Sequence, residues 1–357
     1  YLENAKHVEL QLLADKHGNV VHVGERDCSL QRRHQKLWEE APAEIPQDVR
    51  TAMREAGVRA AKAIKYDSVG TIECLVSGDA FYFLEMNTRI QVEHTVTEMI
   101  AGLDLVREQI RAAAGEPLTY AQSEISFRGC SIEGRVNAED PGHEFRPVPG
   151  TITAYREPGG PGVRVDSAAY SGWTIPTQYD SLIAKLVVWA PTREDAIARL
   201  RRAIDEYVIE GVPTTLPLLR ALCDEPSVIN ATYDTATLEA FARTHLPALP
   251  DGRVERRPFV SAARRASALR TAPRLTALRR GGTSAGGNTV LSPMHGLIVE
   301  LRVADGDRVT EGQVVAIIEA MKMMNEIRAH RSGRVGTVMV GAGSSVESGS
   351  PLVTIET

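Results

Sequence analysis

The amino-acid sequence predicts an α+β protein that ends in a small all-β domain, and three observations predict this fold class. The stretch 292–319 repeats at 329–356 with a constant offset of 37 residues and no gap, which indicates two copies of one supersecondary unit. Apolar and polar residues alternate near both ends of the chain, as they do in strands with one buried face. Between these ends, segments of helical periodicity are separated by glycine and proline.

The composition excludes several classes of protein. The chain has 357 residues, a net charge of −5 and 24% charged residues, which is typical of soluble globular domains and indicates neither nucleic-acid nor membrane binding. No apolar run approaches the ~18 residues of a membrane span. The four cysteines are far apart and form no C-x-x-C pair, which fits a reducing cytoplasm and offers no zinc site. The chain begins at Tyr1 rather than Met, so we expect a fragment or a processed piece of a longer protein.

The first segments of the chain predict a hairpin, a charged stretch and a helix. Residues 7–15 and 20–23 are expected to pair about a turn. The charge-dense stretch 25–36 is interpreted either as a solvated loop or as an anion site, because Arg and Lys supply charge-assisted donors. Residues 46–66 are predicted to form a helix with one apolar face.

A second hairpin, turning at residues 77–79, carries the densest chemistry. Pairing of 71–75 with 80–85 places Glu73 opposite Glu85, and like charges opposed on a sheet are destabilising. A divalent cation between the two carboxylates would reverse that effect, and Mg²⁺ favours one or two carboxylates with phosphate oxygens and water. Asn87 can add a neutral oxygen from the same side. The alternative is that both acids reach water at the open end of the hairpin.

Capping residues predict two further helices, and composition predicts a linker after them. Asp104 and Gly115 delimit a helix at 104–114. Thr192 caps a helix at 193–210, with Asp195 in a position like that of a capping box and Gly211 at its end. Residues 245–287 are rich in Pro, Ala, Gly and Arg, and they are interpreted as a flexible tether rather than a nucleic-acid-binding segment.

The two C-terminal repeats meet at the sequence Glu-Ala-Met-Lys-Met, residues 319–323. The repeated units are predicted to pack their apolar faces together as a flattened sandwich or barrel. Lys322 falls at the hairpin turn between them. A lone exposed lysine is usually solvated surface, but methionines flank this one where a turn is normally polar. The motif resembles the biotin attachment site of biotin carboxyl carrier domains, which are related to lipoyl domains. By that resemblance Lys322 carries biotin, attached by a biotin protein ligase.

The segments 31–36 and 85–94 together resemble the ATP-grasp core of biotin carboxylases, and the resemblance extends from about Leu2 to about Val208. It implies four parts. These are the C-terminal part of an ATP-grasp domain at 1–126, a biotin carboxylase C-terminal α+β domain at 127–244, the linker at 245–287 and a biotinyl, lipoyl-like flattened barrel at 288–357.

The resemblance also implies the roles of individual residues. By the resemblance, Mg²⁺ or Mn²⁺ is bound by Glu73, Glu85 and Asn87, and the nucleotide is bound by these two glutamates with His7, Gln31, His34 and Leu75. Bicarbonate is bound by Lys36, Arg89, Gln91 and Val92. The implied catalytic residues are Arg89, Glu93 as the general base, and Arg135 at the biotin ureido group. The chemistry supports these roles. Cations would shield labile carboxyphosphate from water, a carboxylate would take the ureido proton, and a guanidinium would stabilise the ureido oxygen. Taken alone, Arg135 would be interpreted as a structural ion-pair partner.

On this resemblance we expect the C-terminal part of a cytoplasmic biotin-dependent acyl-CoA carboxylase α chain of the acetyl-CoA or propionyl-CoA type. It would be a ligase that forms a C–N bond by carboxylating biotin with ATP and bicarbonate. Its expected partners are further copies of the carboxylase part and a carboxyltransferase β subunit. Two alternatives stay open. The chain could belong to another carboxylase, such as methylcrotonyl-CoA carboxylase, or it could be an inactive fragment that serves as a carrier and assembly module, since the sequence contains no phosphate-binding lid.

Overall fold

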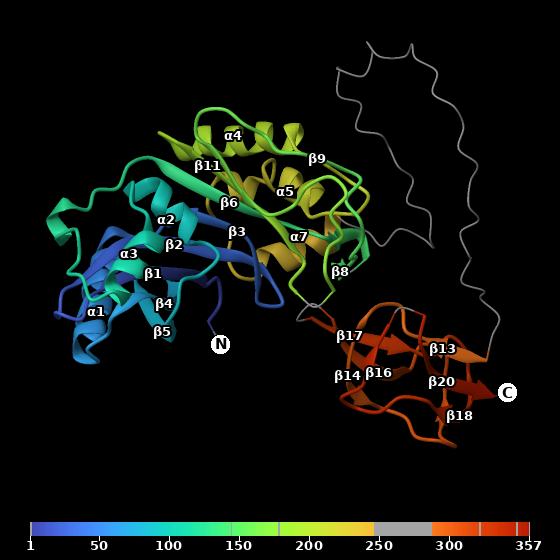
Figure 1. The fold of residues 1–357 in the computed structure, drawn as a ribbon. Coiled ribbons are helices and arrows are strands. Elements are labelled where there is room, and N and C mark those ends of the chain that lie inside the picture. Colours follow the sequence, from blue (N-terminus) through green and yellow to red (C-terminus); the bar gives the residue numbers. More distant parts are fainter. Residues whose placement is uncertain are drawn as a thin grey trace, which may run out of the picture. The chain divides into compact units, whose positions relative to one another are not determined.

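The computed structural model describes residues 2–143, 145–177, 179–245, 288–320, 323–347 and 349–356. The chain divides into a larger unit, residues 1–176 with 181–247, and a smaller unit, residues 177–180 with 248–357. Figure 1 shows the elements of both units. The predicted linker lies outside the described residues apart from its first residue, and so does Lys322.

The larger unit is built on one eight-stranded sheet, in which every pair of neighbouring strands is antiparallel. In sheet order its strands are β10 (Val163–Ser167), β11 (Leu182–Ala190), β6 (Cys130–Asn137), β3 (Gln35–Ala41), β2 (Val20–Arg32), β1 (Lys6–Ala14), β4 (Ser68–Ser77) and β5 (Ala80–Asn87). Two small sheets lie outside it and pair β7 (Glu139–Asp140) with β8 (Arg146–Pro147), and β9 (Ala154–Arg156) with β12 (Val208–Glu210).

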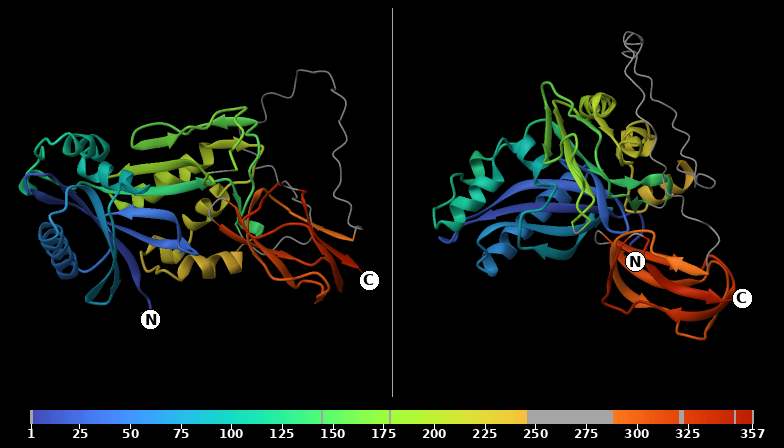
Figure 2. Two further views of the ribbon diagram at one scale, coloured as in Figure 1. Left: turned by 60° about the horizontal axis from the view of Figure 1, so that its bottom comes forward. Right: turned by 45° about the vertical axis from the view of Figure 1, so that its right-hand side comes forward.

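Helices cover both faces of the large sheet (Figure 2). The α-helices are α1 (Gln47–Ala63), α2 (His94–Ala101), α3 (Leu105–Ala113), α4 (Arg193–Glu206), α5 (Leu216–Leu222), α6 (Pro226–Ile229) and α7 (Thr237–His245), with 3₁₀ turns at Gln122–Glu124 and Pro141–His143. One face of β1 presents Val8, Leu10 and Leu12 to α1. The other face presents His7, Glu9 and Gln11, because side chains alternate along a strand.

The structure confirms both predicted hairpins and corrects the loop interpretation of residues 25–36. β2 continues to Arg32 and β3 begins at Gln35, so most of this stretch is strand. The strand tolerates its charges because each face supplies partners. Glu25 accepts hydrogen bonds from Arg50 and Arg54 of α1, whereas Arg26 bonds to Glu9 across the sheet.

The predicted boundaries of the two capped helices are confirmed at three ends and wrong at one, and the helix predicted at residues 46–66 is α1, which ends earlier, at Ala63. Asp104 accepts a hydrogen bond from the backbone N–H of Arg107, and Gly115 follows α3 with a φ of 85°. Thr192 caps α4 by accepting from the backbone N–H of Asp195. α4 ends at Glu206 rather than at residue 210, since residues 208–210 form β12 and pair with β9.

The smaller unit confirms the repeat. Equivalent strands lie 37 residues apart: β14 (Gly296–Leu301) and β18 (Gly333–Val338), β15 (Arg308–Val309) and β19 (Ser345–Val346), and β16 (Val314–Ala320) and β20 (Pro351–Glu356). With β13 (Thr289–Leu291) and β17 (Met323–Arg328) they form two four-stranded sheets, β13-β20-β18-β15 and β17-β16-β14-β19. Their apolar residues share one core. The described strands therefore form a sandwich and not a closed barrel.

Two repeat-related glycines show why the pattern recurs. A Cβ atom on Gly296 would lie less than 3.0 Å from the carbonyl oxygen of Glu319. A Cβ atom on Gly333 would likewise lie less than 3.0 Å from the carbonyl oxygen of Glu356. In each repeat the first strand therefore approaches the backbone of the third, and only glycine fits there.

We predict that Gly333→Ala lowers the free energy of unfolding of the smaller unit by about 1–3 kcal/mol, the usual cost of inserting a methyl group where there is no space. Urea unfolding of a 288–357 fragment measures the change. Gly341→Ala is the matched control, since the nearest atom to its Cβ is a serine hydroxyl at 3.7 Å. Equal effects of the two substitutions would refute the backbone-contact explanation.

Candidate functional site

Four charged residues form a row across four adjacent strands of the large sheet. Arg26 on β2 is the register partner of Glu9 on β1, Glu9 is the partner of Glu73 on β4, and Glu73 is the partner of Glu85 on β5. Directly paired residues point to the same face of a sheet. The predicted opposition of Glu73 and Glu85 is therefore confirmed, and it belongs to a longer row.

Arg26 is completely buried, and all five of its N–H donors are used. Nε donates to Glu9, one Nη donates to Gln11 and Thr97, and the other donates to Thr71 and Gln91. A buried guanidinium is costly unless it is paired and hydrogen-bonded throughout. This arginine consequently connects β1, β4, α2 and the loop before α2.

Lys36 of β3 reaches the middle of the row. Its Nζ lies 2.6 Å from a carboxylate oxygen of Glu93 and 3.3 Å from one of Glu73, and it also bonds to Glu9. Burial favours neutral lysine, but Glu9 and the other anionic groups outweigh it and raise the pKa of Lys36. Lys36 is therefore a fixed cation among three carboxylates.

Glu93, immediately before α2, lies between two cations. It accepts from Lys36, and its second oxygen accepts from an Nη of Arg135 at 2.9 Å. Burial alone would raise the pKa of Glu93, but Arg135 and Lys36 lower it well below the ordinary value. Arg135 is held from its other side by Glu39, whose carboxylate accepts from Nε at 2.5 Å.

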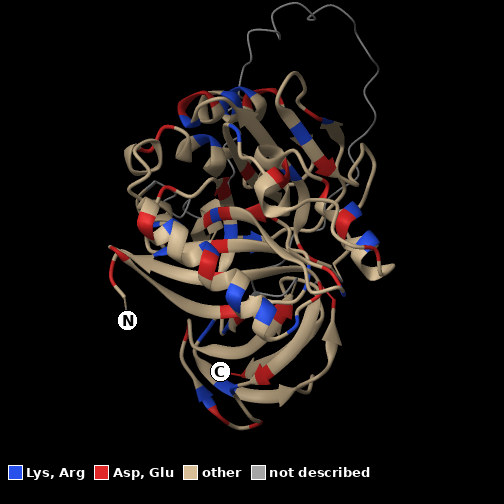
Figure 3. Cartoon of the chain, turned by 90° about the vertical axis from the view of Figure 1, so that its left-hand side faces the viewer, with Lys and Arg blue, Asp and Glu red and all other residues tan. Residues whose placement is uncertain are grey.

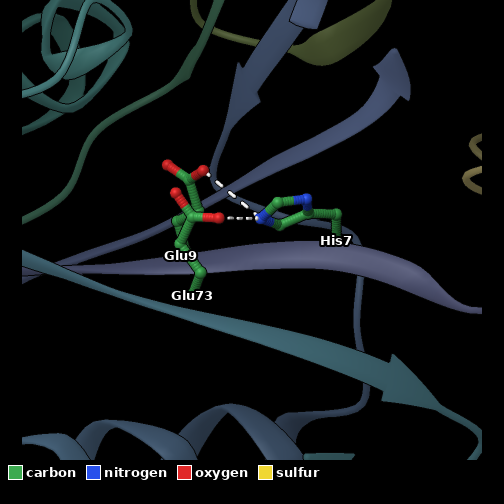
Figure 4. Close-up of side chains that lie close together, drawn as sticks. All are labelled: His7, Glu9 and Glu73. Carbon is green, nitrogen blue, oxygen red and sulfur yellow. Dashed lines mark ion pairs between the residues drawn. The ribbon is translucent and has the colours of Figure 1, made fainter. Parts of the chain in front are cut away.

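Glu73, a predicted metal ligand, contacts His7 as well as Lys36. Nε2 of His7 lies 2.8 Å from Glu73 and 3.5 Å from Glu9. Figure 4 shows the His7 ring pointing toward the two carboxylates. Burial would raise the pKa of Glu73, but the adjacent His7 and the charge of Lys36 lower it to about 2. Glu73 is thus ionised, as a metal ligand must be.

Asn87 lies between the two predicted metal carboxylates. Its Nδ2 donates to Glu73 at 2.9 Å and to Glu85 at 3.2 Å. Turning the amide over would point its oxygen at the same place. Two carboxylates and one amide oxygen are the hard ligands that Mg²⁺ prefers, so the residues present fit such an ion.

The structure brings most of the predicted site residues together. Gln31 lies 3.4 Å from the ring of His7, Leu75 is the register partner of His7, and Gln91 donates to Glu73. Two residues make no hydrogen bond or ion pair with this cluster in the described part of the chain. His34 is exposed in the β2–β3 turn, and exposed Arg89 donates to the carbonyl oxygen of Ile90.

Sequence reasoning missed four members of the site, namely Glu9, Arg26, Glu39 and Lys185. Lys185 of β11 donates to the carbonyl oxygen of Val92 at 3.2 Å and so fixes the loop before Glu93. The alternation of His7, Glu9 and Gln11 with apolar residues could have shown a polar strand face. The other three carry no comparable local signal. Figure 3 shows that acidic and basic residues are intermixed along the strands and helices.

Three protein families match consecutive parts of the chain. Residues 1–121 match the ATP-binding domain of the carbamoyl-phosphate synthase L chain, residues 133–240 match the biotin carboxylase C-terminal domain, and residues 288–355 match the biotin-requiring enzyme family. The chain is a homologue of biotin carboxylases with a biotin-lipoyl domain attached. The larger unit has the ATP-grasp biotin carboxylase fold.

Individual relatives support this relationship. Biotin carboxylase 2 of Populus trichocarpa chloroplasts is 56% identical over 238 residues, which cover 66% of this chain and 45% of that protein. The biotin-dependent acyl-coenzyme A carboxylase alpha3 subunit of Mycobacterium leprae is 39% identical and covers 100% of this chain and 65% of its own length. The solved biotin carboxylase domain of a thermophilic 2-oxoglutarate carboxylase is 52% identical, with a TM-score of 0.66. The match covers 67% of this chain and 55% of the solved chain.

The chain spans about half the length of the biotin carboxylases it matches. Within the described residues, no helix is both long and apolar enough to cross a membrane. The four cysteines are buried and free.

We predict that Arg26→Leu lowers the free energy of unfolding by about 3–5 kcal/mol, because it leaves the buried Glu9 carboxylate without its arginine. Chemical denaturation of the chain measures the loss. The control is Arg59→Leu, because the side chain of Arg59 is 70% exposed and its guanidinium lies 3.6 Å from Glu55; this substitution should change stability by less than about 0.5 kcal/mol. A similarly small loss of stability in Arg26→Leu would contradict the role of Arg26 in connecting the surrounding strands and helix.

Proposed function

We propose that this chain carries the biotin carboxylase and biotin carrier functions of an acyl-CoA carboxylase. It would carboxylate a biotinyl group on Lys322 with bicarbonate at the expense of ATP, for transfer to an acyl-CoA by a separate carboxyltransferase subunit. The observation that carries the proposal is Glu93 placed between Lys36 and Arg135, beside the acid pair Glu73 and Glu85.

The arrangement of the cations suits a small oxyanion. Lys36 and Arg135 both contact Glu93, so an anion that binds at this point meets two positive charges and a base. Gln91 is held by Arg26 and Glu73, which places its amide at the edge of the same site. One related structure is described as bound to bicarbonate and another as bound to MgADP and bicarbonate, which supports these ligands here.

The proposed metal site would serve the nucleotide. Glu73 and Glu85 supply two ionic ligands and Asn87 a neutral one, while His7, Gln31 and Leu75 lie alongside. A bound Mg²⁺ would neutralise charge on the phosphates during phosphoryl transfer. Arg89 and His34, exposed in the described structure, are proposed to meet bicarbonate and nucleotide once these bind.

The carrier role rests on the strands around Lys322. β16 ends at Ala320, β17 begins at Met323, and these two residues are register partners. The intervening connection is therefore two residues long, and it lies at the junction of the two repeats. A biotin protein ligase is the proposed partner for the modification.

The acyl-CoA assignment is the finer part of the proposal. Similarity over the whole chain to the Mycobacterium leprae protein supports it, and acetyl-CoA and propionyl-CoA are the proposed acceptors. A second candidate is a pyruvate carboxylase made of separate subunits, since one such pyruvate carboxylase polypeptide from Methanothermobacter thermautotrophicus is 55% identical over 223 residues. Transfer assays with co-purified partner proteins and a panel of acceptors distinguish the two. A related biotin carboxylase domain is described as a dimer, which supports a homo-oligomer.

We predict that Lys322 is the sole biotinylated residue. Co-expression with a biotin ligase followed by streptavidin blotting should label the wild-type chain. Lys322→Ala and Lys322→Arg should remove the signal, because guanidinium is not nucleophilic at neutral pH. Lys62→Ala, which changes an exposed helical lysine, should leave it intact. Staining that persists in Lys322→Ala would disprove the carrier assignment.

We predict that Glu93→Gln lowers the rate of free-biotin carboxylation by on the order of 10²-fold or more, the usual scale for removing a general base. Nucleotide affinity should be unchanged, because Glu93 is not proposed as a metal ligand. The assay uses this chain joined to the N-terminal half of a related biotin carboxylase. Glu55→Gln at an exposed helical site is the control. Near-normal turnover by Glu93→Gln would exclude it as the base.

A further inference from the structure

Two buried glutamates oppose each other below Arg135. Glu39 on β3 and Glu133 on β6 are register partners and are both 0% exposed. Their side chains therefore leave the sheet on the same face, away from water. Two ionised carboxylates directly opposite each other on a sheet repel, and burial strengthens that repulsion.

Each carboxylate uses one oxygen and leaves the other without a partner. Glu39 accepts from Nε of Arg135 through Oε1, and Glu133 accepts from the hydroxyl of Thr95 through Oε2. Oε2 of Glu39 and Oε1 of Glu133 are buried, and neither has a hydrogen bond within the described part of the chain. Two ionised carboxylates cannot satisfy each other because both only accept.

We propose that Glu39 and Glu133 share one proton, so that the pair carries a single negative charge beneath Arg135. With one proton on the pair, one of the two unpaired oxygens becomes a hydrogen-bond donor and the other remains an acceptor. Glu39 contacts the guanidinium at 2.5 Å, so it carries the charge, and Glu133 carries the proton.

The surrounding charges are consistent with one proton. Arg135 and Lys185 are the cations that act on Glu133, and Arg135 and Lys36 are those that act on Glu39, while Glu93 opposes ionisation of both. Burial is the largest influence on each group and raises the pKa of both carboxylates above the ordinary glutamate value. Arg135 is thereby a cation with two anionic neighbours, Glu39 and Glu93, rather than three.

The role of Arg135 described here rests on the proposed function, whereas the number of protons on the Glu39–Glu133 pair does not depend on it. Glu39 keeps Nε in place while Nη2 contacts Glu93, and Nη1 has no hydrogen bond among the described residues. A singly charged pair anchors the guanidinium without cancelling its charge. Glu39 is accordingly a positioning residue for Arg135, and Glu133 is the proton holder that makes this possible.

Infrared spectroscopy of the 357-residue chain in D₂O tests the proton directly. At pD 6, wild type minus Glu133→Gln should show the C=O stretch of one carboxylic acid, and wild type minus Glu39→Gln should show the same band. Glu40→Gln is the matched control, because this buried neighbour is bonded twice by Arg193 at 3.0 Å; its difference spectrum should lack the band. No acid band at Glu133 or Glu39 would overturn the proposal.

Stability against pH gives a second measurement. The pair holds one more proton in the folded than in the unfolded chain between the ordinary glutamate pKa of 4.5 and the raised folded values. The wild-type folding constant, relative to that of Glu133→Gln, should therefore fall about tenfold per pH unit from about pH 5 to about pH 7. A ratio independent of pH over this range would mean that both carboxylates are ionised. A failure of biotin carboxylation would refute the proposed function and leave both measurements intact.

Discussion

The buried guanidinium of Arg26 is the interaction on which the larger unit depends. It lies in the middle of an eight-stranded sheet and is 0% exposed, yet each of its five N–H groups has an acceptor. Those acceptors come from β1, β4, α2 and the loop that precedes α2. An arginine in this position fixes the mutual placement of the elements, because any displacement would leave a buried donor or a buried charge unsatisfied.

The chemical site follows from this constraint. Arg26 holds Glu9 on one side and Gln91 on the other, and Gln91 in turn donates to Glu73. Lys36 then joins Glu9, Glu73 and Glu93. Glu73 on the β4–β5 hairpin and Glu93, the proposed base before α2, are far apart in sequence, but they share these buried contacts. Rigid support of this kind is what a site for a charged, short-lived intermediate needs.

The sequence predicted features that depend on local spacing and missed those that depend on sheet order. Glu73 faces Glu85 because a short hairpin determines the register, and the 37-residue repeat determines the strands of the smaller unit. Arg26 and Glu9 could not be recognised in this way, since their importance arises only when β1 lies between β2 and β4. Residues 25–36 were interpreted as a loop or an anion site because no local signal shows that both faces of β2 are covered. Glu39 and Glu133 meet only through the non-local pairing of β3 with β6.

The low proton affinity of Glu93 constrains its proposed role as a base. Lys36 and Arg135 lower the pKa of this carboxylate, and a carboxylate paired with two cations is a weak acceptor of protons. An oxyanion that binds to the same lysine and arginine would compete with Glu93 for them. When the substrate weakens one of these ion pairs, the pKa of Glu93 rises and the carboxylate accepts a proton more readily. On this argument Glu93 becomes an effective base only when the site is filled, so that the base and the substrate are coupled through two shared cations.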